Sequence, residues 1–141
     1  MQTIIGKNYT KQVIPLIESA KKSIKIVVYD WRWYENEPAN ACQLFNASIV
    51  RARKRAVSVQ ACVNSDSIAK PLRENDIEVK IPVSKNLMHT KFLIIDDSIL
   101  VMGSHNFSES AFTTNFETSV IIDDPLQIND FIVLFHSLWE L

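Results

Sequence analysis

The sequence has few of the residues that define several protein classes. Its 141 residues include only two Cys and two Gly, which excludes a disulfide-stapled scaffold, a zinc ribbon and a collagen-like chain. No apolar run approaches the ~18 residues that a membrane-spanning helix needs. The N-terminus shows no basic segment followed by a long apolar stretch, the pattern of a signal peptide. We therefore expect a cytoplasmic protein with Cys42 and Cys62 as reduced core thiols.

Basic residues are absent from the last third of the chain. All 15 Lys and Arg lie within residues 1–91, which carry a net charge of +7, whereas residues 92–141 carry −8. The overall charge of −1 is therefore the sum of two strongly charged portions. Either the two portions interleave in space and their charges mix, or the basic portion gathers an anionic substrate around a site.

Hydrophobic periodicity predicts a single α/β domain spanning residues 1–141, built from helices and strands that alternate along most of the chain. Two βαβ passes followed by a hairpin predict a mixed, mainly parallel sheet with helices on both faces. The expected helices are residues 8–21, a helix opening at Glu37-Pro38, residues 66–75 and a last helix from Pro125; the expected strands are residues 23–30, 57–63, 77–83 and 116–123, with a hairpin over 89–102.

The last predicted helix has almost no polar face. Its apolar residues are Leu126, Ile128, Phe131, Ile132, Val133, Leu134, Phe135, Leu138 and Trp139. A helix that is apolar on all sides must be covered on most of them. Either a second copy of the chain or a neighbouring loop is expected to supply that cover.

Five polar residues in the second half carry the candidate chemistry: His89, Lys91, Ser104, Asn106 and Glu117. His89 and Lys91 are two apart at a strand start, so their side chains share one face. An imidazole can attack or donate a proton near neutral pH. Lysine, serine and asparagine supply charge and donors for a phosphate oxygen, and a glutamate can hold the second imidazole nitrogen. This set suits phosphoryl transfer through a phosphohistidine, and without a carboxylate cluster we expect no metal and no cofactor.

The spacing of these residues is similar to that of a known family. HTKFLIIDDSILVMGSHN, residues 89–106, fits the HxK(x)4D(x)6GSxN pattern of the phospholipase D superfamily. With Glu117 added, the sequence resembles the small bacterial nucleases of that superfamily. The similarity extends to length and to the order of strands and helices. It implies a phospholipase D-like fold and a metal-independent phosphodiester hydrolase.

The resemblance also implies an active site made from two motifs placed face to face. One histidine attacks phosphorus, and the other protonates the leaving oxygen and then activates water. Larger relatives carry both motifs in one chain, but this sequence has one, because no other Lys follows Lys91. We therefore expect a homodimer in which each copy contributes His89, Lys91, Ser104, Asn106 and Glu117, with a two-fold axis through the site.

Other residues in and near the motif are expected to have roles outside the chemical step. Asp96 is expected to hold the hairpin turn or backbone, and Gly103 to let the backbone approach the ligand closely. Alternation points His105 away from the site, towards packing or the rim, and His136 is expected to be a core or surface residue rather than a ligand.

The substrate is inferred from the segment after the first long strand. Trp31, Trp33 and Tyr34 could stack on bases and Arg32 could pair with phosphate. Lys21, Lys22 and the basic group at 51–55 add positive charge. The alternative is a hydrophobic lid with solvated basic helix ends. We expect a nucleic-acid substrate, DNA in preference to RNA, and no stable membrane association. The alternatives are a lipid phosphodiesterase, or a nucleic-acid-binding domain of a larger restriction or helicase-like enzyme.

Overall fold

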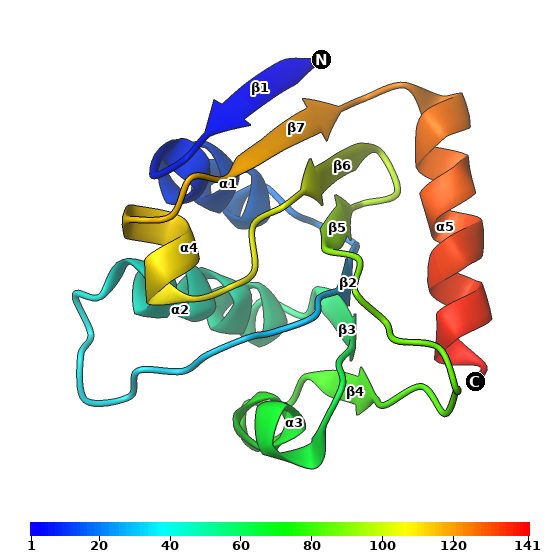
Figure 1. The fold of residues 1–141 in the computed structure, drawn as a ribbon, viewed down its shortest axis with the longest axis horizontal. Helices are drawn as coiled ribbons and strands as arrows, with labels where there is room; N and C mark the ends of the chain where they lie inside the picture. Colours follow the sequence, from blue (N-terminus) through cyan, green and yellow to red (C-terminus); the bar gives the residue numbers. More distant parts are fainter.

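The computed structural model describes all of residues 1–141 and contains seven strands and five helices (Figure 1). In chain order they are β1 (Gln2–Ile5), α1 (Asn8–Glu18), β2 (Ser23–Val27), α2 (Ala41–Lys54), β3 (Ser58–Cys62), α3 (Asp66–Glu74), β4 (Glu78–Lys80), β5 (Phe92–Ile95), β6 (Ile99–Gly103), α4 (Glu109–Thr113), β7 (Thr118–Ile122) and α5 (Pro125–Trp139). The predicted α/β class and all the predicted elements are confirmed.

The seven strands form one sheet in the order β1-β7-β6-β5-β2-β3-β4. The sheet is mixed, as expected, but the expectation of mainly parallel pairing is wrong. Only β2–β3 and β3–β4 are parallel, and the other four pairings are antiparallel. The reason is that β2 pairs with the β5–β6 hairpin, on which β7 and β1 then add antiparallel strands.

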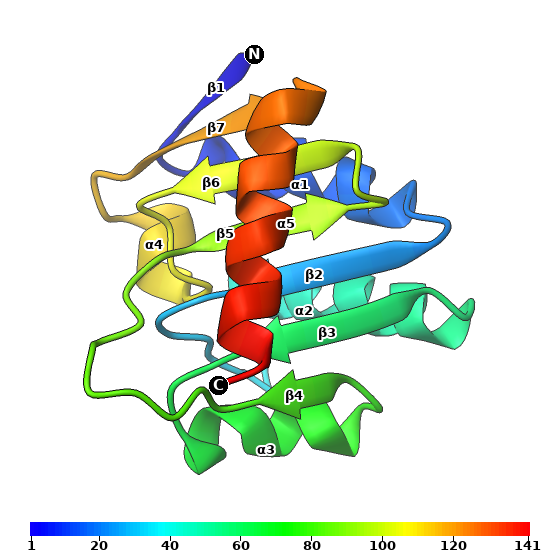
Figure 2. The ribbon, with the colours of Figure 1, turned by 90° about the vertical axis from the view of Figure 1, so that its right-hand side faces the viewer.

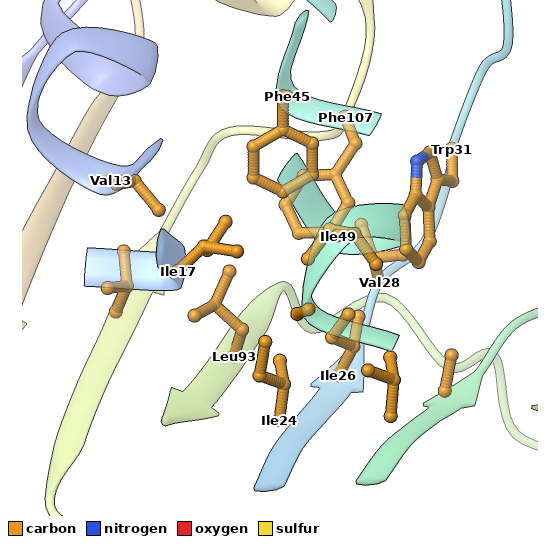
Figure 3. Close-up of a cluster of buried hydrophobic side chains, with 14 of the residues drawn as sticks. Val13, Ile17, Ile24, Ile26, Val28, Trp31, Phe45, Ile49, Leu93 and Phe107 are labelled. Atoms are coloured by element: carbon orange, nitrogen blue, oxygen red, sulfur yellow. The ribbon is translucent and has the colours of Figure 1, made fainter. Parts of the chain in front are cut away.

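Helices cover both faces of the sheet, as predicted. Figure 2 shows α5 crossing one face, with α1, α2 and α3 behind the other. Along β2, Ile24 and Ile26 pack on the face of α1 and α2, whereas Val27 belongs to the smaller cluster beneath α5. This alternation is the period-2 pattern of a strand buried on both sides. Figure 3 shows the larger cluster, in which Phe45 and Ile49 of α2 lie over the strands.

The start of α2 differs from the prediction. The helix begins at Ala41 rather than at Glu37-Pro38, because Asn40 caps it. The Oδ1 atom of Asn40 accepts hydrogen bonds from the backbone N–H groups of Cys42 and Gln43. Asparagine at this position satisfies N–H groups that have no partner inside the helix, and it therefore sets the boundary more strongly than the preceding proline does.

Two short elements had no sequence signal strong enough to predict them. β1 has four residues and pairs with β7 at the sheet edge. α4 has five residues and is capped by Ser108, whose side chain accepts a hydrogen bond from Ala111 N. Both are shorter than the window over which periodicity can be recognised.

The apolar last helix is covered on its inner side by the sheet itself. Ile128 and Phe135 are buried there, and Phe92 of β5 contacts Phe131 at a ring-centroid distance of 5.1 Å. On the opposite side Leu126 is 80% and Val133 57% exposed. Cover of this outer side by a second copy or a loop stays a prediction. None of the five helices has the length and apolar character needed to cross a bilayer.

Both cysteines are buried and unpaired, as predicted. Burial raises the pKa of Cys42 to about 12 and that of Cys62 to about 11. Because the thiolate is the reactive form, both groups are unreactive at neutral pH.

Candidate active site

The five predicted catalytic residues lie at one end of the sheet. His89 and Lys91 directly precede β5, Ser104 and Asn106 directly follow β6, and Glu117 directly precedes β7. Because β6 is antiparallel to both β5 and β7, these three positions meet at the same end. This is the left-hand end of the sheet in Figure 2. The structure therefore brings together residues that are separated by up to 28 positions in the sequence.

His89 and Lys91 form the first contact pair of the site. The Nζ atom of Lys91 lies 3.4 Å from Nδ1 of His89 and donates a hydrogen bond to the His89 backbone oxygen at 2.8 Å. The His89 side chain is exposed, whereas Lys91 is half-buried. Burial lowers the pKa of Lys91, and the negative charge of Glu117 opposes that shift. The ammonium group is thus placed beside the imidazole, where a phosphate oxygen could approach both.

Ser104 and Glu117 form the second contact pair. The Ser104 hydroxyl donates to Glu117 Oε1 at 2.6 Å and accepts from the backbone N–H of Thr118 at 3.0 Å. The second carboxylate oxygen accepts from the Asn115 amide at 3.1 Å. In a single chain the Ser104 proton is directed at Glu117, so the expected roles of Ser104 toward a phosphate oxygen and of Glu117 toward an imidazole stay predictions. Within a single chain, neither carboxylate oxygen is hydrogen-bonded to His89.

Asn106 is oriented by the end of β2. Its Oδ1 atom accepts a hydrogen bond from the backbone N–H of Asp30 at 3.2 Å. With the carbonyl side of the amide held in this way, the two Nδ2 hydrogens point away from Asp30 and are available as donors. The role of Asn106 as a neutral donor to a phosphate oxygen stays a prediction.

Asp96 holds the backbone at the opposite end of the sheet, as predicted. Its carboxylate accepts hydrogen bonds from the backbone N–H groups of Lys21, Lys22 and Ser23 at 2.7–3.2 Å. Burial acts to raise the pKa of Asp96, but these hydrogen bonds outweigh it and the pKa is lowered. Asp96 also has a φ of 53°, in the left-handed region that Asn and Asp tolerate better than other side chains.

The lowered pKa of Asp96 predicts a pH-dependent stability. The contribution is complete above the unfolded-state pKa of about 3.9 and is lost as the pH falls through the lower folded-state value. We expect Asp96→Asn to lower the free energy of unfolding at pH 7 by about 1–3 kcal/mol. The difference in free energy of unfolding between Asp96→Asn and the wild type, measured by urea unfolding, should become smaller below about pH 4. Asp96→Ala should be less stable still, because alanine also disfavours the positive φ. A difference that stays constant with pH would contradict this role.

Gly103 is required by a strand rather than by a ligand. A Cβ atom at this position would collide with the backbone of Ser119 and Thr118 in β7. The expectation that Gly103 lets backbone approach a ligand is therefore corrected: the close approach is between β6 and β7.

The other two histidines are structural or exposed, as predicted. His105 is buried between Ser119 Oγ at 2.7 Å and the Gly6 backbone oxygen at 2.9 Å, and burial lowers its pKa. Its ring joins Gly6, which follows β1, to Ser119 of β7, and packs against Tyr9 at a centroid distance of 4.6 Å. His136 is exposed on α5.

The predicted substrate-binding residues divide into three cases. Trp31 is 1% exposed and donates from Nε1 to Asn46 Oδ1 at 2.6 Å, so it packs in the core and the prediction of stacking is wrong. Its large apolar ring is stabilised by burial against Phe45 and Phe107. Arg32 is exposed and forms an ion pair with Asp30 at 2.8 Å. Trp33 is half-buried. Substrate binding by Arg32 and Trp33 stays a prediction.

The basic groups of α1 and α2 do not surround the site. Lys21 and Lys22 precede β2, and the basic group at 51–55 precedes β3. These positions are at the starts of the two parallel strands, whereas the site is at the opposite end of the sheet. Arg51 is further paired with Glu18. The expectation that this charge gathers phosphate at the site is therefore wrong.

Three site residues were missed from the sequence. Tyr29 lies two residues after β2 with its ring centroid 4.7 Å from that of His89, Asn64 lies two residues after β3, and the Asn115 amide donates a hydrogen bond to Glu117. The available signal was position, because residues that follow parallel strands gather at one edge of a sheet. That signal points to Tyr29 and Asn64 but gives no guide to Asn115.

Solved structures share this fold over nearly the whole chain. Nuc from Salmonella typhimurium, a phospholipase D family member, superposes with a TM-score of 0.80 and covers 98% of this chain and 93% of that one, at 22% identity. NucT from Helicobacter pylori superposes with a TM-score of 0.78, covers 98% and 94% of the two chains, and is also 22% identical. The architecture is thus that of a phospholipase D-like α/β domain.

The sequence comparison gives the family. Residues 13–139 match the family described as the cardiolipin synthase, phospholipase D-like domain. The chain therefore belongs to the phospholipase D-like family, as the motif at residues 89–106 predicted. It is 24% identical over 135 residues to the mitochondrial cardiolipin hydrolase of Xenopus tropicalis, covering 92% of this chain and 60% of that protein. The chain thus spans little more than half the length of such relatives.

Proposed function

We propose that the chain is a metal-independent phosphodiesterase that cleaves nucleic acid, DNA in preference to RNA, at a site shared by two copies. The observation that supports this most directly is the gathering of His89, Lys91, Asn106 and the Ser104–Glu117 pair at one sheet end. A single chain supplies one imidazole there, and an attack on phosphorus followed by protonation of the leaving oxygen needs two.

The proposed reaction has two balanced steps. An imidazole nitrogen of His89 in one copy attacks phosphorus, so that a P–N bond forms and the P–O bond to the leaving group breaks. His89 of the second copy gives its proton to the leaving oxygen. That second imidazole then accepts a proton from water, whose oxygen attacks phosphorus, breaks the P–N bond and releases a phosphomonoester. Lys91 and the Asn106 amide stabilise the charge on the phosphate oxygens.

A polar pocket beside the site favours a nucleotide substrate. The pocket has a volume of about 400 Å³ and is lined in part by Asp30, Arg32, Trp33 and Ser67. It adjoins the site because the backbone N–H of Asp30 holds Asn106. The Arg32 guanidinium, the serine hydroxyl and the indole of Trp33 are groups that bind phosphates and bases.

A lipid phosphodiester is the second candidate, and a different pocket favours it. This pocket has a volume of about 500 Å³ and reaches Met88, the residue before His89. Its apolar lining residues are Leu87, Met88, Leu138 and Leu141, and Asn64 and Lys85 are among its polar ones. Leu87 is 69% exposed beside the catalytic motif. The name of the Xenopus relative, cardiolipin hydrolase, points to the same substrate class. A binding module without turnover is disfavoured by the intact motif.

Substrate class and metal independence are tested together. We expect the purified protein to cleave plasmid DNA in the presence of EDTA, because the site offers an imidazole, an ammonium, an amide and one hydrogen-bonded carboxylate rather than a cluster of metal ligands. RNA and vesicles of cardiolipin with phosphatidylcholine serve as parallel substrates. Cleavage of the vesicles alone would reject the nuclease. Activity that EDTA abolishes and Mg²⁺ restores would reject the metal-independent mechanism.

A further inference from the structure

His89 lies near the end of an irregular segment. Residues 81–91 connect β4 to β5 without a helix or strand. Much of the segment is solvated, with Val83 79% and Leu87 69% exposed. The nearest regular element, β5, begins only at Phe92. The position of the His89 ring therefore depends on contacts other than a strand ladder.

Asn64 supplies one such contact with both hydrogens of its amide. Nδ2 donates to the backbone oxygen of Tyr29 at 3.0 Å and to the backbone oxygen of Met88 at 3.1 Å. Tyr29 follows β2 after one buried residue, Val28, and Met88 directly precedes His89. One side chain after β3 thus joins a rigid strand end to the residue next to the candidate nucleophile.

The Tyr29 ring packs against the imidazole of His89. Its centroid is 4.7 Å from that of the His89 imidazole, with an interplanar angle of 53°. The Nζ atom of Lys91 lies 5.6 Å from the Tyr29 centroid, within the range of a cation–π interaction. Tyr29 therefore contacts both members of the His89–Lys91 pair through its ring.

We propose that Asn64 is a positioning residue for His89. By joining the backbone of Met88 to the backbone of Tyr29, it holds the His89 imidazole against the Tyr29 ring. The proposal rests on the proposed function in taking His89 as the reacting group. Two other contacts keep the segment attached without Asn64: Met88 is buried, and the Lys91 backbone oxygen accepts a hydrogen bond from Gly103 N at 3.3 Å. Loss of Asn64 should therefore broaden the orientation of His89 without unfolding the segment.

The kinetic test uses bis(p-nitrophenyl) phosphate, a simple phosphodiester that carries neither a nucleobase nor an acyl chain. We expect Asn64→Ala to lower kcat by about 30- to 100-fold, with an almost unchanged KM and thermal midpoint. Asn64→Asp should lose as much, because a carboxylate cannot donate to two carbonyl oxygens. Tyr29→Leu should show the same loss, and Tyr29→Phe should retain activity because its ring is kept.

The matched control is Asn75→Ala. The Asn75 amide also donates to a backbone oxygen, that of Pro71 at 2.8 Å, but it lies at the end of α3 away from the site. This variant should keep the wild-type kcat. If kcat in Asn64→Ala is unchanged, or falls only in proportion to a loss of folded protein, the positioning role is wrong.

A second measurement does not depend on activity. In the wild type, ring current from Tyr29 should shift the NMR resonances of the His89 imidazole, and Asn64→Ala and Tyr29→Leu should both move them towards free-histidine values. A wild-type chain that is inactive on every diester would overturn the proposed function alone, and the His89 resonances would then decide the positioning role. Resonances unchanged in Asn64→Ala would overturn that role.

Discussion

A His89→Ala variant should lose at least about a thousandfold in phosphodiester hydrolysis, because the imidazole is both the proposed nucleophile and the proposed acid. Its fold should persist. The His89 side chain is exposed, and its ring contacts only the Lys91 ammonium and the Tyr29 ring among the interactions described above. The thermal midpoint should therefore stay within about two degrees of wild type.

The matched control for this result is His136→Ala. His136 is likewise exposed but lies on α5, outside the site, and its replacement should leave kcat unchanged. The covalent step gives an independent check, since rapid quenching with substrate should trap phosphate on His89 in the wild type and none in His89→Ala. Activity near the wild-type level in His89→Ala, with a clean preparation, would exclude the phosphohistidine mechanism.

The sequence predicted the residues of the motif more reliably than it predicted the residues around the site. Spacing within residues 89–106 was enough to predict the hairpin, the common face of His89 and Lys91, and the structural role of Asp96. These are local features, since they depend on residues close in sequence, in the β5–β6 hairpin and in the three residues that precede it. The period-2 and helical patterns likewise located the predicted elements, because burial on both faces of the sheet imposes a repeating pattern on the strands.

The failures arose where tertiary packing decides the outcome. Trp31 and Trp33 read alike in sequence, yet Asn46 of α2 offers the Trp31 indole a buried acceptor and the core encloses its ring. The hydrogen bond between the Ser104 hydroxyl and Glu117, which directly precedes β7, could not be predicted from the sequence either, because it depends on the pairing of β6 with β7. The basic residues at 51–55 were predicted to lie near the site only because they are positively charged. The sheet topology puts them at its other end, before the start of β3.

The corrected charge distribution strengthens the case for a second copy. With the basic helix ends remote, few cations remain beside the site: Lys91 is half-buried, and Arg32 is paired with Asp30. A phosphodiester held by a single chain would meet one ammonium and one imidazole. Two copies related by a two-fold axis that passes through the site would supply two ammonium groups and two imidazoles.

A heterodimer of one wild-type chain and one His89→Ala chain should therefore be as inactive as the His89→Ala homodimer, about a thousandfold below wild type. Each proposed site needs both imidazoles, one to attack phosphorus and one to protonate the leaving oxygen, and the heterodimer has a single one. If each chain acted alone, the heterodimer would instead keep about half of the activity. Two different affinity tags and sequential purification give the heterodimer free of either homodimer.

The companion heterodimer carries His136→Ala in one chain and should be fully active, which shows that the tags and the exchange of chains do no harm. Light scattering on the same samples reports the oligomeric state. When wild type and His89→Ala are mixed and allowed to exchange, activity should fall with the square of the wild-type fraction, because only pairs of intact chains are competent. A linear fall, or an active monomer in light scattering, would show that one chain holds a complete site and that the paired-histidine mechanism is wrong.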